Sequence, residues 1–115
     1  PPSHYAKTNC WYGASFPRPA DLAGRHLVGV DHVLWGADYP HFEGTYPYTL
    51  ESLRLAFSDI ESTEVRKILG QNAAELFGFD YKALQRIAAG CGPTVDQIAE
   101  PLLEKPSDAT SPCFW

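Results

Sequence analysis

Two short apolar runs near the start of the chain have the composition of strands. Residues 9–16 (NCWYGASF) and 32–35 (HVLW) are rich in aromatic, aliphatic and β-branched side chains, which is typical of buried strands. Between them, residues 17–31 carry apolar positions at helical spacing, and Gly29 is placed to end a short helix. A link of this length favours a right-handed parallel crossover over a hairpin. The pattern therefore predicts a strand, a short helix and a second, parallel strand.

The next part of the chain carries apolar positions at steps of three and four, which predicts helices. The stripes and their end signals divide it into helices over residues 47–60, 61–70, 72–77 and 80–89, with a last weak turn from Thr94. Gly70 is expected to end the second of these helices, which is either separate or a continuation of the first after a break. Asn72 is expected to cap the third helix and Gly78 to end it, while Asp80 and Thr94 are expected to cap the fourth helix and the last turn. On the fourth helix, Leu84, Ile87 and Ala88 are expected to face inward.

The two ends of the chain lack such periodicity. Residues 1–8 are polar and begin with proline, which predicts a loop. From residue 100 onwards, prolines recur among Ser, Asp, Thr and Lys, which predicts a loose tail over 100–115. The expected organisation is one domain over 1–99 followed by this tail.

The stretch DHVLWGADYPHFEGTYP, residues 31–47, places chemistry directly after the second strand. Asp38, His41 and Glu43 fall within six residues, where the strand pattern has ended, and Gly44 permits a turn. A buried strand that delivers ionisable groups into a loop at its carboxyl end is the layout of an α/β active site.

Each candidate side chain also has a purely structural interpretation, and spacing alone leaves both open. Asp38 is suited to bind a divalent cation and accept a proton, or to make an Asx-type turn. His41 is suited to orient a substrate carboxylate or share a proton with Asp38, or to be solvated. Glu43 is a substrate-binding candidate, although the pattern favours an exposed loop charge. Trp35 is suited to line a substrate pocket or to pack in the core.

Two segments resemble the amidohydrolase-related (amidohydrolase 2) family of the metal-dependent hydrolase superfamily. Residues 35–47, WGADYPHFEGTYP, are similar to its last-strand signature, which usually has Ser in place of Ala37. Residues 67–78, KILGQNAAELFG, resemble the helical signature that closes the same barrels. The resemblance runs from about residue 2 to residue 80. It implies an α/β fold: the C-terminal portion of a TIM (β/α)8 barrel, with its last two parallel strands followed by a run of helices.

The resemblance also implies a function for the intact parent protein. Asp38 falls on the family's metal-binding and proton-transferring aspartate, and the implied cofactor is a divalent metal, with zinc as the first candidate. The implied activity is that of a hydrolase or decarboxylase acting on a small carboxylic acid or lactone. A catalytic zinc takes about three protein ligands, and the family's other ligands come from segments that these residues do not include. We therefore expect the 115 residues alone to be inactive and to bind metal weakly.

A non-catalytic alternative remains open, in which a truncated barrel end serves binding or association. The chain has no methionine and begins Pro-Pro-Ser, which predicts a fragment or a processed product. The exposed edges of two parallel strands favour self-association. The expected partners are therefore a small-molecule substrate and either a second copy of the chain or the missing N-terminal part of the barrel.

Composition and charge limit the kinds of partner and the cellular compartment that we expect. Hydrophobic residues make up 44% of the 115 residues, enough for a packed core, and the formal net charge is −5. This charge, without any basic cluster, argues against nucleic acid or an anionic membrane as a partner. Three widely spaced cysteines, with no signal-peptide pattern at the amino terminus, predict reduced thiols in a cytoplasmic protein.

Overall fold

Two short parallel strands form the only sheet in the structure, a computed structural model that describes all residues, Pro1–Trp115. Strand β1 (Tyr12–Ser15) pairs with β2 (Val33–Gly36), and the register runs from Tyr12 opposite Val33 to Ser15 opposite Gly36. The crossover between them consists of α2 (Pro19–Ala23), α3 (Arg25–Val28) and the 3-10 turn η1 (Val30–His32). Gly29 ends α3 with a φ of 99°. The predicted parallel pair and its helical link are confirmed, although β1 is shorter than the apolar run over 9–16 and β2 begins one residue later than the run over 32–35.

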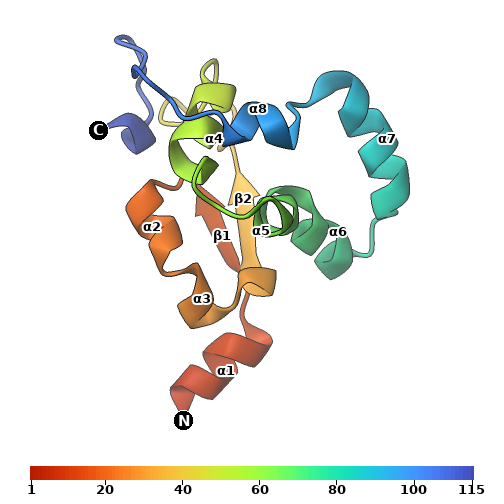
Figure 1. Cartoon of the computed structure of the whole chain (residues 1–115). Coiled ribbons are helices and arrows are strands. Elements are labelled where there is room, and N and C mark those ends of the chain that lie inside the picture. The colour runs from red at the N-terminus through yellow and green to blue at the C-terminus, as the bar shows by residue number, and fades with distance from the viewer.

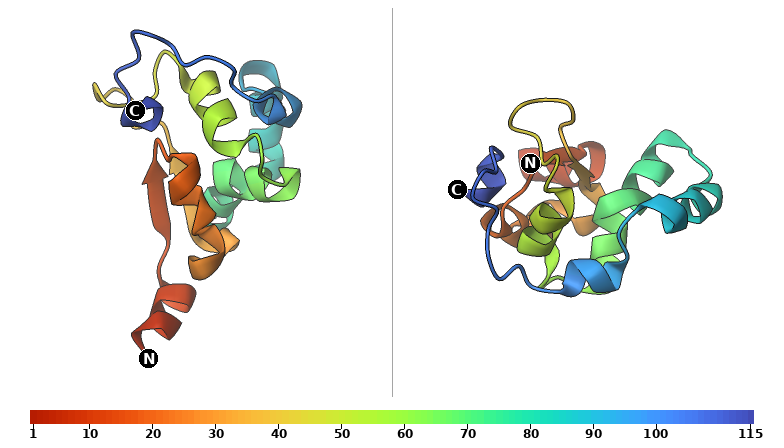
Figure 2. Two further views of the ribbon diagram at one scale, coloured as in Figure 1. Left: turned by 60° about the vertical axis from the view of Figure 1, so that its left-hand side comes forward. Right: turned by 90° about the horizontal axis from the view of Figure 1, so that it is seen from above.

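Helices cover one face of this sheet and leave the other bare (Figure 2). On the covered face, Ala14, Val33 and Trp35 pack in or against the hydrophobic core. On the opposite face, Gly13 and Ser15 are exposed. The two strands therefore bury their side chains in one direction only.

The helical half of the chain supplies the rest of the core. Its elements are α4 (Thr49–Phe57), α5 (Ser62–Arg66), the π-helical turn η2 (Lys67–Gln71), α6 (Asn72–Phe77), α7 (Tyr81–Cys91) and α8 (Val95–Ala99) (Figure 1). The buried residues of the core cluster are Leu22, Val33, Leu53, Ala56, Phe57, Val65, Ile68 and Ile98. Phe57 of α4 has no exposed surface, so α4 packs at the centre of this cluster.

The break predicted at Gly70 and the cap predicted at Asn72 are both wrong. Helices α5 and α6 continue into one another through η2, and Asn72 has helical φ and ψ of −58° and −43°. Its side chain is buried, and its Nδ2 donates hydrogen bonds of 2.8 Å to the carbonyl oxygens of Val30 and Val33. Asn72 therefore ties the helix to the start of β2 instead of capping a helix of its own.

Helix α7 differs from its predicted packing. It begins at the predicted cap, where Oδ1 of Asp80 accepts a 3.0 Å hydrogen bond from the backbone N–H of Ala83. None of its residues is buried, however, and Leu84 and Ile87 are 44% and 66% exposed. Leu84 and Ala88 do face the core, but across a cavity of about 590 Å³ that they line together with Trp35 and Leu53, so the stripe is left unburied because no element packs closely on it. In Figure 1 this helix lies at the edge of the molecule.

The two termini hold more structure than their sequence indicates. Residues predicted as a loop form α1 (Pro2–Asn9), whose proline in the first turn suits a helix start and which buries no residue. In the Pro-rich segment the 3-10 turn η3 (Pro112–Phe114) forms, and Ser111, Cys113 and Phe114 are buried. No helix in the structure combines the length and apolar character needed to cross a bilayer.

Candidate metal centre

Both strands end in a residue with left-handed backbone conformation at the same edge of the sheet. After β1, Phe16 has a φ of 40°, and after β2, Asp38 has a φ of 58°. The backbone N–H of Phe16 donates to the carbonyl oxygen of Gly36 at 3.2 Å, so the two strand ends lie together. Positive φ is rare outside glycine, although aspartate tolerates it better than bulky residues do, and such conformations gather at functional sites.

The loop that follows β2 is closed by its own backbone. Its N–H groups at His41, Gly44 and Thr45 donate to the carbonyl oxygens of Asp38 (2.9 Å), His41 (3.0 Å) and Ala37 (2.9 Å). Gly44 is buried within this turn, and a Cβ at that position would lie only 2.8 Å from the Asp38 carbonyl oxygen. Only glycine fits at this point of the loop, so the turn expected from the sequence at Gly44 is present.

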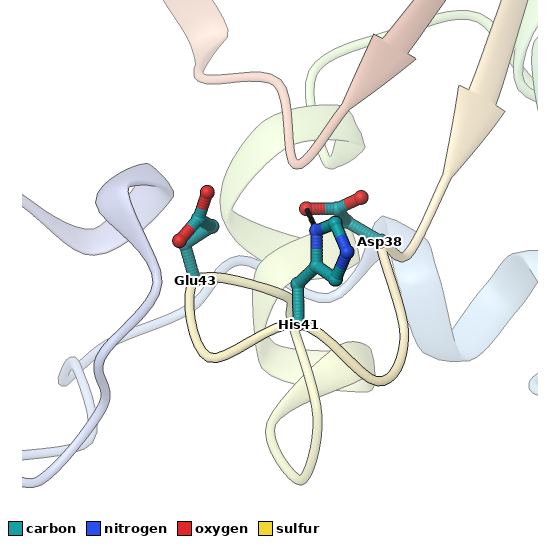
Figure 3. A group of neighbouring side chains, drawn as sticks. All are labelled: Asp38, His41 and Glu43. Carbon is teal, nitrogen blue, oxygen red and sulfur yellow. Dashed lines mark hydrogen bonds and ion pairs between the residues drawn. The ribbon is translucent and has the colours of Figure 1, made fainter.

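Three ionisable side chains from this loop converge (Figure 3). Nδ1 of His41 lies 3.2 Å from Oδ2 of Asp38, and Glu43 brings a carboxylate oxygen to the same place, with all three ligand-capable atoms within 4.8 Å of one another. The Asp38 side chain is 27% exposed and that of His41 is 69% exposed. The sequence predicts these three residues as site candidates, and the structure gathers them into one group, hereafter the Asp38 group.

The donor set of the Asp38 group fits a divalent cation. Zinc binds imidazole nitrogen and carboxylate oxygen at about 2.1 Å, so two ligand atoms in a tetrahedral site lie roughly 3.4 Å apart. Asp38 and His41 are already near that separation, at 3.2 Å. Glu43 is exposed, and its carboxylate oxygen lies within 4.8 Å of the ligand atoms of Asp38 and His41. The group therefore offers three ligands, where the sequence alone makes a convincing case for one.

Trp35 lies apart from this group. Its side chain packs against the core on the helix-covered face and borders a cavity of about 590 Å³ beside Leu53, Val65, Leu69 and α7. Its Nε1 is buried and has no hydrogen-bond partner. The structure thus places Trp35 among the helices, whereas the Asp38 group lies in the loop after the strand.

Comparison with known families assigns the chain. A family model described as amidohydrolase matches residues 1–79, which is well over half of the 115 residues. The chain belongs to the amidohydrolase family. The matched region contains both strands, the Asp38 group and helices α4 to α6. No curated protein matches the chain.

Membership of this family is consistent with metal binding by the Asp38 group. Amidohydrolases are hydrolase-type enzymes that usually bind a metal ion, and in this chain Asp38, His41 and Glu43 are the side chains grouped closely enough to hold one. The resemblance found in the sequence is confirmed, together with the mixed helix and strand architecture and its parallel strand pair.

Proposed function

We propose that the chain is the C-terminal part of an amidohydrolase barrel, in which Asp38 is a metal ligand and a proton-transfer group. The observation that carries the proposal is the position of Asp38 at the carboxyl end of β2, with the imidazole of His41 at 3.2 Å. Active sites of (β/α)8 barrels lie at this end of the strands. Family membership of residues 1–79 supports the same assignment.

The exposed side of the sheet supports the barrel part of the proposal. Barrel strands carry helices on the outer face and turn their other face to the interior. Here the helices cover one face only, and the bare face presents Gly13 and Ser15. Small side chains at that face leave room for substrate or for the packing of further strands.

The proposed chemistry follows from the groups present. A bound divalent cation, with zinc as the first candidate, supplies Lewis-acid polarisation of water or of a substrate oxygen. The Asp38 carboxylate holds the cation and accepts or returns a proton. His41 has two alternative roles: it joins Asp38 as a ligand, or it stays off the cation and orients a substrate carboxylate or shares that proton. The proposed reaction is hydrolysis or decarboxylation of a small carboxylic acid or lactone.

A second function is favoured by the open edges of the sheet. Strands β1 and β2 each have one unpaired edge, which can pair with another chain. A non-catalytic association module would use those edges and would not need the Asp38 group.

Zinc titration of the chain, followed by NMR, distinguishes these functions. We expect zinc to shift the resonances of the His41 ring and the loop amides, and Asp38→Asn to weaken binding at least about 10–100-fold, the range that even outer-shell changes produce. Asparagine also tolerates positive φ, so the loop conformation is kept. The matched control is Asp59→Asn, which makes the same charge change at an exposed position outside the group. Equal affinity in the Asp38 variant and the wild type would exclude Asp38 as the ligand and leave the association module.

A further inference from the structure

The C-terminal segment returns to the loop after β2 (residues 37–48, hereafter the metal loop), although the segment lies outside the family match. Arg54 of α4 holds its start, donating from Nε to the carbonyl oxygen of Glu100 (2.8 Å) and from Nη2 to that of Pro101 (3.2 Å). Residues 105–115, hereafter the strap, then run back past the loop that follows β2. Lys105 Nζ donates to the carbonyl oxygen of Phe114 at 2.9 Å, which closes the strap on itself.

Two side-chain hydrogen bonds join the strap to the metal loop. Oγ1 of Thr110 donates to the carbonyl oxygen of Phe42 at 2.7 Å, and the hydroxyl of Tyr48 donates to Oδ1 of Asp108 at 2.6 Å. The hydrogen bond to Asp108 raises the pKa of Tyr48 above its usual value. The strap therefore holds the loop in its middle, at Phe42, and at its far end, at Tyr48.

The Thr110 contact falls between two members of the Asp38 group. Phe42 separates His41 from Glu43, and its own side chain is 79% exposed, so core packing does not fix its backbone. The hydrogen bond from Thr110 is the one bond that reaches residues 39–44 from outside the loop. The end of the strap is itself anchored, because Ser111, next to Thr110, is buried.

We propose that Thr110 is a positioning residue for the metal loop, fixing the backbone between His41 and Glu43 through the Phe42 carbonyl. The immobilised carbonyl keeps the two side chains on the side of the loop where Asp38 lies. Loss of the hydroxyl frees this part of the loop without removing any ligand. The consequence for metal affinity rests on the function proposed above, whereas the consequence for loop order does not.

Amide hydrogen exchange of the full chain tests the effect on loop order. Thr110→Val keeps the side-chain shape and removes the donor, whereas Thr110→Ser keeps the hydroxyl. In the valine variant we expect the hydrogen-bonded amides of Gly44 and Thr45 to exchange about fivefold faster, the change that corresponds to one lost hydrogen bond. Amides of α4 serve as the internal reference, because exchange that rises equally there reports general destabilisation.

The possible outcomes distinguish the proposal for Thr110 from the proposal for the metal site. Unchanged Gly44 and Thr45 exchange relative to α4 in the valine variant, or a serine variant that behaves like valine, overturns the positioning role. Faster loop exchange with a zinc affinity reduced about fivefold supports both proposals. Faster loop exchange with an unchanged zinc affinity supports the role of Thr110 in loop order and overturns its effect on the metal site.

Discussion

Replacement of Asn72 by alanine should destabilise the protein more than any surface change on the same helix. The Asn72 side chain is 3% exposed, and its Nδ2 donates to two backbone carbonyl oxygens, of Val30 and Val33, at 2.8 Å each. These carbonyls lie just before and at the start of β2, whose other end leads to Asp38. Alanine removes both of these hydrogen bonds.

The size of the effect follows from the contacts. Each hydrogen bond contributes about 0.5–1.5 kcal/mol net, and a buried acceptor left unsatisfied costs about 1–3 kcal/mol. The Val30 carbonyl oxygen keeps a second bond, from the backbone N–H of Val33, so alanine leaves the buried Val33 carbonyl oxygen as the acceptor that loses its partner. One unsatisfied acceptor together with the lost bond to Val30 gives an expected loss of about 2–4 kcal/mol. With an unfolding entropy of about 2.1 cal/mol/K per residue over 115 residues, this loss lowers Tm by roughly 8–16 °C.

Thermal unfolding followed by circular dichroism measures this shift, and the neighbouring residue provides the control. The Gln71 side chain makes one exposed hydrogen bond, from Nε2 to Oε1 of Glu75 at 2.8 Å. Such pairs contribute about 0.2–0.5 kcal/mol, so Gln71→Ala should lower Tm by roughly 2 °C or less. Asn72→Asp should be at least as damaging as alanine, because it presents an acceptor to two carbonyl oxygens. If Asn72→Ala and Gln71→Ala unfold at the same temperature, the tether from helix to strand carries no stability and the reasoning fails.

Two further substitutions test the loop and its anchor. Gly44→Ala places a Cβ 2.8 Å from the Asp38 carbonyl oxygen. It should lower the free energy of unfolding, measured in urea, by roughly 1–3 kcal/mol and should also weaken zinc binding. Gly90→Ala, on exposed α7 with nothing within 4 Å of its Cβ, should be neutral or stabilise by up to about 1 kcal/mol, and a matching loss there would contradict the steric argument. The raised pKa of Tyr48 beside Asp108 favours the neutral phenol in the folded state, so its stabilisation is complete below about pH 10 and disappears as pH rises through the folded pKa. The difference in unfolding free energy between wild type and Tyr48→Phe should therefore shrink above pH 10, and a constant difference would show that the bond to Asp108 is not linked to titration.

Local signals in the sequence predict the parts of this fold that depend on neighbours in the chain. The composition of the strands, the length of their link and the caps at Asp80 and Thr94 are all read within a few residues, and the structure contains each of them. Gly78, which ends α6 in a left-handed conformation with a φ of 70°, is another feature that a local signal predicts. Asp38 is predicted as a site residue because it follows a strand and because its motif resembles that of the family.

Other features depend on partners far along the chain, and the sequence pattern does not indicate them. An asparagine two residues after a glycine has the pattern of a cap, but the hydrogen-bond partners of Asn72 lie 42 and 39 residues away, so it ties the helix to the strand instead. The apolar stripe of α7 predicts burial, but burial needs a packing partner that this chain does not bring to it. Periodicity states which side chains would be buried, and only tertiary packing decides whether they are.

The metal loop combines both kinds of information. Its three candidate ligands come from six consecutive residues, so a short motif is enough to bring Asp38, His41 and Glu43 together. The contacts that hold this loop come from residues 60 and 68 positions away in the sequence, at Asp108 and Thr110. The family match ends at residue 79, so it covers Asp38 but not the strap that contacts its loop. Variation in the strap should accordingly change how firmly the loop is ordered while the ligand set stays the same, which makes affinity and ligand identity separable properties of this site.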